Sequence, residues 1–175
     1  MTTATEEAGA FGRALLAETK RRLFRDSQPR IHRCLAQLTE EEIWFRPNAE
    51  TVSVGNLVLH LLGNVRQQLL SGLCGAPDRR RRQTEFDERG PIPAAELLRR
   101  LDELMAEVDQ ALDGVDPQSL LTVRKVQGYE ESGLSIVVHV IEHFSYHVGQ
   151  MTYFVKSRKA VDMGYYAGID LNVTS

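Results

Sequence analysis

The stretch LSIVVHVIEHFSYHVGQMTYFVK, residues 134–156, decides the fold class of this chain. We expect it to form the longest helix, beginning at about Ser132 or Leu134. His139, His143 and His147 stand in it at successive four-residue steps. Because an α-helix has 3.6 residues per turn, the three imidazoles project from nearly the same face and drift slowly around it. Two imidazoles spaced i and i+4 can bind one metal ion together.

Three further amphipathic segments precede this helix. Apolar residues keep helical spacing over residues 6–38, with a break or kink expected at Pro29, which has no backbone N–H. A second helix is expected over residues 53–70, from a serine N-cap to a stop at Gly72. A third opens at a proline and covers residues 93–112.

The connections between these helices carry weaker signals. Residues 39–42 have the form of a capping box and predict a short helical turn that leads to Trp44. Residues 78–91 are the least hydrophobic part of the chain and predict a long surface connection, in which the arginines at 79–82 are solvated. Residues 120–129 are extended in character and suggest a short strand.

Four amphipathic helices, one long connection and almost no strand predict an all-α helix bundle, with residues 1–175 forming a single domain. Apolar residues make up 42% of the chain and charged residues 26%, which is typical of a soluble globular protein. The net charge of −3 gives no reason to expect a nucleic-acid partner. Neither a membrane span nor a secretion signal is evident, and Cys34 and Cys74 match no disulfide framework, so we expect a cytoplasmic protein.

His60 lies among leucines in the middle of the second helix, where an unpartnered imidazole would leave its ring nitrogens unsatisfied. A single histidine in such a helix is more often a hydrogen-bonded core residue than a metal ligand. Together with the histidines of the last helix, however, His60 favours a metal site inside the bundle. Spacing alone does not decide whether the pair on the last helix is His139 with His143 or His143 with His147. His32 is expected to be a surface or packing residue.

Three segments resemble the DinB/YfiT-like superfamily of metal-binding bundles: WFRP at 44–47, SVGNLVLHLLGN at 53–64, and HVIEHFSYHVGQ at 139–150. The resemblance implies an antiparallel four-helix bundle with a long crossover between the second and third helices. It also implies a metal site made by His60, His143 and His147, with His139 nearby but not a ligand. Dimers are frequent among such proteins, so a homodimer is an expectation here.

Three imidazole ligands leave at least one coordination position open, as catalytic metal sites do. Such ligands suit several divalent transition metals, and we expect zinc or nickel. The resemblance implies hydrolysis, or transfer that uses a low-molecular-weight thiol as cosubstrate. We therefore expect a metal-dependent thiol transferase or hydrolase that acts on a small molecule. The alternatives are a non-catalytic module that binds a metal or small ligand, and an interaction bundle whose histidines hold no metal.

Several polar residues are expected near the ligands because of their helical spacing. Asn56 and Asn64 lie one turn before and one turn after His60, so either could orient a ligand or a bound water. Glu142 and Gln150 lie close to the ligand pair of the last helix. Arg46 is a candidate for binding an anionic substrate, although solvent exposure is its simpler interpretation.

Overall fold

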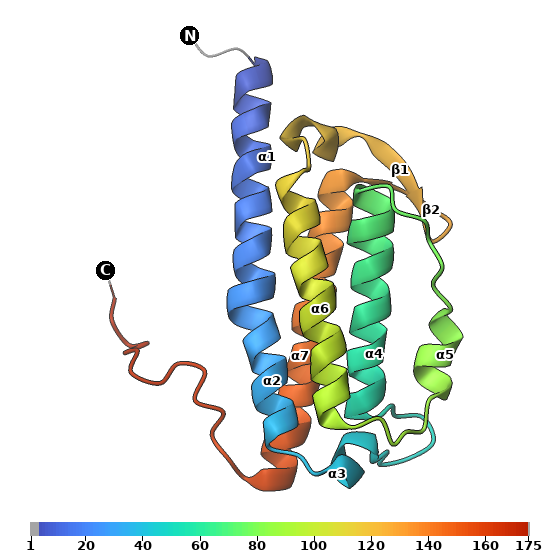
Figure 1. The fold of residues 1–175 in the computed structure, drawn as a ribbon. Coiled ribbons are helices and arrows are strands. Elements are labelled where there is room, and N and C mark those ends of the chain that lie inside the picture. Colours follow the sequence, from blue (N-terminus) through green and yellow to red (C-terminus); the bar gives the residue numbers. More distant parts are fainter. Residues whose placement is uncertain (1–3, 175) are drawn as a thin grey trace.

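The computed structural model describes residues 4–174, which are mostly helical with a small two-stranded sheet (Figure 1). The first helical segment comprises α1 (Ala4–Lys20), a π-helical stretch η1 (Arg21–Ser27) and α2 (Gln28–Ala36). Pro29 therefore does not break the helix. Its missing N–H and its ring are accommodated by the wider π-helical turns that immediately precede it. The break or kink expected at Pro29 is replaced by a change from π-helix to α-helix at Gln28.

Two capping boxes start the next two helices. Thr39 and Glu42 cap α3 (Glu40–Trp44), as predicted. Ser53 and Asn56 cap α4 (Val54–Val65), which continues as the π-helical stretch η2 (Arg66–Leu73). The predicted end at residue 70 was too early, because Gly72 is helical and lets Val126 of the sheet pack against it.

A long crossover then leads to α6 (Ala94–Asp113). In Figure 1 it runs back along α4, so that α4 and α6 start from the same end of the molecule. The prediction of a plain surface connection was incomplete, because the crossover contains the short helix α5 (Arg82–Asp87) and Glu85 of α5 is buried. An apolar pattern alone cannot reveal a helix that is held by buried charges.

A short 3₁₀ helix, η3 (Pro117–Leu121), and a hairpin connect α6 to the last helix. Strands β1 (Val123–Val126) and β2 (Tyr129–Ser132) pair antiparallel, with Val126 opposite Tyr129. The two turn residues, Gln127 and Gly128, both have positive φ, as a tight hairpin turn requires. The hairpin confirms the short strand suggested for residues 120–129 and adds a second strand, so the mostly helical chain also contains a small sheet.

Helix α7 (Gly133–Lys159) follows directly after β2 and begins at the N-cap Ser132. One core cluster joins α7 to the other long helical segments, and Phe144 is its bulkiest fully buried side chain. Cys34 is buried and Cys74 exposed, and both are free thiols. Within residues 4–174, no helix has both the length and the apolar character needed to cross a membrane.

Candidate metal centre

The imidazoles of His60, His143 and His147 meet between α4 and α7. The Nε2 atom of His143 lies 3.1 Å from Nε2 of His60 and 3.2 Å from Nε2 of His147. Candidate ligand atoms of the three residues all lie within 4.8 Å of one another. The structure thus brings together residues that are 83 positions apart in the chain, and it selects His143 with His147 as the pair on the last helix.

The hydrogen-bond partners of His60 and His147 indicate tautomers that favour a cation at the meeting point of the rings. Nδ1 of His60 lies 2.9 Å from a carboxylate oxygen of Glu85, and Nδ1 of His147 lies 2.7 Å from Oε1 of Gln150. With a hydrogen on each Nδ1, both residues direct an Nε2 lone pair toward His143. Nitrogens bound to one tetrahedral zinc ion lie about 3.3 Å apart, which is close to the observed separations. The donor set therefore fits a transition metal.

Burial keeps the two histidines of α7 in the form that binds metal. Burial, together with the neighbouring rings of His147, His60 and His139, lowers the pKa of His143 to about 3. Burial also lowers the pKa of His147, against the opposing effect of its bond to Gln150. Both rings are consequently neutral at neutral pH, with lone pairs free for coordination.

Two residues of the crossover complete the surroundings of His60. The guanidinium of Arg80 pairs with Glu85 through contacts of 2.7 Å and 2.8 Å, and both side chains are at least nine-tenths buried. Burial of Glu85 favours its protonated form, but Arg80 and His60 outweigh burial and hold the pKa of the carboxyl below its ordinary value. Glu85 is thus an anion that accepts a hydrogen bond from His60.

Sequence reasoning missed both of these residues. Arg80 belongs to a run of four arginines that was interpreted as solvated, and its neighbours Arg79 and Arg81 are indeed exposed. Glu85 is followed by Asp87 and Glu88, and nothing in the sequence marks it as the buried acidic residue. Only the path of the crossover beside α4 brings Glu85 to the metal centre.

The polar residues predicted near the ligands have different surroundings. Gln150 contacts His147, as expected from their spacing. His139 is exposed, stacks on His143 with ring centroids 5.3 Å apart, and approaches the amide of Asn64 at 3.3 Å.

The remaining candidates lie away from the imidazoles. Asn56 donates to the carbonyls of Glu85 and Glu88, so it anchors the crossover rather than a ligand. Glu142 is exposed on α7. The guanidinium of Arg46 donates to the carbonyls of Ala49 and Thr51 and so holds the loop after α3. A contact between Arg46 and a substrate stays a prediction.

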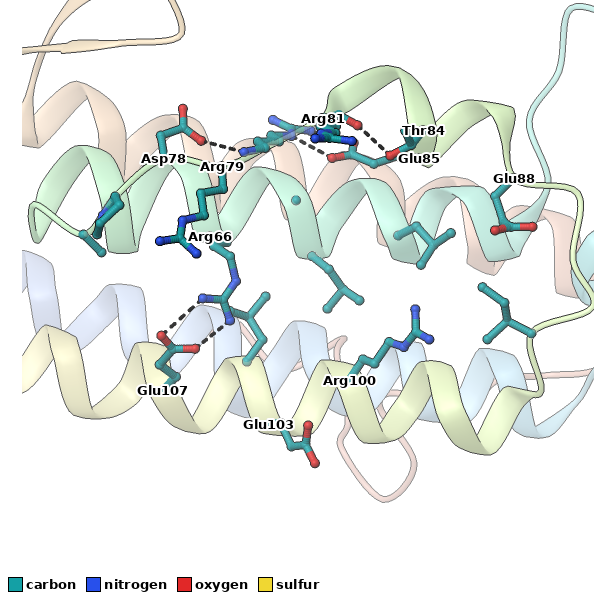
Figure 2. Close-up of a pocket in the computed structure, with 18 residues that line it drawn as sticks. Arg66, Asp78, Arg79, Arg81, Thr84, Glu85, Glu88, Arg100, Glu103 and Glu107 are labelled. Atoms are coloured by element: carbon teal, nitrogen blue, oxygen red, sulfur yellow. Dashed lines mark hydrogen bonds and ion pairs between the residues drawn. The ribbon is translucent and has the colours of Figure 1, made fainter.

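A cavity of about 890 Å³ lies between α4, the crossover and α6. Figure 2 shows Glu85 in its wall and an ion pair between Arg66 and Glu107 across it. The Arg80–Glu85 pair therefore separates this cavity from the three histidines. The cavity side chains labelled in Figure 2 carry charges of both signs, so the cavity has no clear preference for an anion or a cation.

The fold resembles that of a DinB-like protein of known structure. The crystal structure of a DinB-like protein from Bacillus cereus ATCC 10987 has a TM-score of 0.57 and 16% identity to this chain. The match covers 82% of this chain and 93% of that one, and at this identity it shows the fold alone. No curated protein matches the chain. The family model described as "Protein of unknown function (DUF1572)" matches residues 10–166, and the chain belongs to this family.

Proposed function

We propose that this protein is a metalloprotein of the four-helix-bundle class, with a long crossover between its second and third helices. One divalent transition metal ion is held by Nε2 of His60, His143 and His147. The observation that supports the proposal most directly is the meeting of these three nitrogens, with separations of 3.1 Å and 3.2 Å between neighbours. Zinc and nickel both suit such a set of ligands.

The chain's own residues prepare this set of ligands. Glu85 and Gln150 each accept a hydrogen bond from the outer ring nitrogen of one ligand, which fixes the orientation of His60 and His147. Nδ1 of His143 is buried and has no hydrogen-bond partner in the described part of the chain. His143 is oriented instead by its neighbours on α7 and by the stacked ring of His139.

We further propose that the protein is an enzyme, either a thiol-dependent transferase or a hydrolase that acts on a small molecule. Three protein ligands leave a coordination position free, which is the arrangement of catalytic rather than structural sites. When bound, the metal would supply a Lewis acid able to lower the pKa of a water or a thiol. The cytoplasmic location and the homodimer stay predictions.

Turnover by metal-loaded protein tests the enzymatic part of this proposal. Zinc- and nickel-loaded samples would be assayed against a panel of thiol-conjugation and hydrolysis reactions, with His143→Ala as the matched variant. We expect activity in the wild type and its loss in the variant, because His143 supplies the central nitrogen. Metal-loaded wild type that is inactive throughout the panel would instead indicate a non-catalytic binding module. Equal activity in both proteins would place the chemistry elsewhere.

A further inference from the structure

A second cavity, of about 930 Å³, lies between α7, the N-terminal end of α4 and the segment after α3. We call it the aromatic groove. Its size falls within the range of pockets that bind small molecules, about 300–1,000 Å³. The lining residues on which the argument depends are Phe45, Val52, Leu57, Gln150, Tyr153 and Phe154.

The aromatic groove begins next to the metal centre. Gln150 lines it and is hydrogen-bonded to His147 at 2.7 Å. On α7, positions 143, 147, 150 and 154 follow one another at steps of four, three and four, so they share one face of the helix. Leu57 of the groove lies three residues before His60 on α4. Both walls of the groove therefore continue the two helix faces that carry the histidines.

The lining of the aromatic groove combines aromatic and aliphatic side chains with polar ones, among them Glu42, Glu50 and Arg158, and it is partly open to water. The rings of Phe45 and Phe154 lie 6.4 Å apart, and Tyr153 is 77% exposed. The guanidinium of Arg158 lies 4.5 Å above the Phe45 ring and is held by Glu42, so this charge already has a partner. Exposed aromatic surface is stabilised when a flat apolar group covers it.

We propose that the aromatic groove holds a flat, apolar part of a small-molecule substrate whose reactive end reaches the three histidines. This inference rests on the proposed function, because it assigns the substrate class to the same site. It also gives Arg46 an indirect role: by holding the carbonyls of Ala49 and Thr51, Arg46 shapes one wall of the groove.

Two thiols of different shape test the proposal. Cobalt(II)-loaded protein would be titrated with benzyl mercaptan and with ethanethiol, and each dissociation constant would be read from the thiolate-to-cobalt absorption band. We expect benzyl mercaptan to bind about tenfold more tightly, since its ring covers apolar surface that ethanethiol does not reach. Tyr153→Ala should reduce that ratio by about threefold or more, because an exposed wall of the groove is lost.

Tyr129→Ala is the matched control, because Tyr129 is 67% exposed on the hairpin, away from the groove. An unchanged ratio in Tyr153→Ala, or an equal change in both variants, would overturn the proposal. So would sedimentation showing a dimer that Tyr153→Ala dissociates, since a second copy of the chain would then cover the groove. If cobalt-loaded protein binds the two thiols with equal affinity, the proposal for the aromatic groove is wrong, but the proposed metal site is not contradicted. Failure to take up cobalt contradicts the proposed function as well.

Discussion

His143 is the residue at which the contacts of the metal centre converge. Its Nε2 lies within 3.2 Å of both other ligand nitrogens, and burial together with the neighbouring rings lowers its pKa to about 3. Its position could be predicted from the sequence because it follows from helical spacing within one helix. The partner that fixes His60 could not, because Glu85 reaches the site only through the path of the crossover.

At the residue scale, Glu85→Gln is expected to weaken metal binding by about 10- to 100-fold. An amide holds Nδ1 of His60 less strongly than a carboxylate does, and Arg80 loses its counter-charge. Gly63→Ala should act in the same direction without changing a ligand, because its methyl group would collide with the carboxylate of Glu85. Zinc dissociation constants from competition with a chelator measure both effects.

The control for these variants is Glu103→Gln, since Glu103 is exposed and pairs with Arg99 on α6. Affinities would be compared at a temperature where circular dichroism shows every variant folded. If Glu85→Gln bound zinc as tightly as the wild type, Glu85 would have no part in positioning His60.

At the scale of elements, helix α5 and the short helix α3 could be predicted to different degrees. The capping box of Thr39 and Glu42 is a local signal, and it located α3 correctly. Helix α5 depends on long-range contacts. These are the contact between Glu85 and His60 and the hydrogen bonds that Asn56 donates to carbonyls of the crossover. Long-range contacts of buried polar groups leave no periodic pattern, so α5 was missed.

Metal binding is expected to stabilise the crossover locally. A metal that fixes His60 also fixes its hydrogen bond to Glu85, so opening of α5 would require the loss of metal-centre contacts. Hydrogen–deuterium exchange with and without zinc should show slower exchange over residues 82–88, with little change in the hairpin at 123–132. Slower exchange in α4 and α7 while α5 stays unchanged would mean that the crossover is independent of the metal.

The end of α7 is tied to α3 by a carboxylate whose contribution depends on pH. Lys159, the backbone N–H of Thr39 and Arg158 together lower the pKa of Glu42 to about 2 from an ordinary value near 4.5. A lowered pKa means that the contribution to stability is present above pH 4.5 and is lost as the pH falls toward 2. Glu42→Gln removes the charge while glutamine still suits the capping box.

Glu42→Gln is therefore expected to lower the Tm at pH 7 by up to about 3 °C, a difference that shrinks below pH 4.5. Thermal melts at several pH values measure it, with the neighbouring exposed residue varied in Glu41→Gln as the control. A difference that persists undiminished at pH 2 would rule out the ion pairs as its cause.

At the scale of the whole molecule, the order of the long helices could be predicted because each has an apolar face and clear end signals. The hairpin was only suggested by the sequence, and η1 and η2 were not foreseen, since π-helical turns depend on how the backbone is packed. The three ligands were expected from a family resemblance, and their meeting required α4 and α7 to lie side by side. That arrangement is a property of the complete fold.

The central claim is that one metal ion is bound by three histidines of two helices. Elemental analysis of protein purified without chelator, compared with His60→Ala and His147→Ala, tests it most directly, with His32→Ala as the matched control. We predict about one equivalent of zinc or nickel in the wild type and the control, and a loss of most of it in the other two variants. Full metal content in His60→Ala and His147→Ala, or no metal in the wild type after incubation with either ion, would contradict the claim.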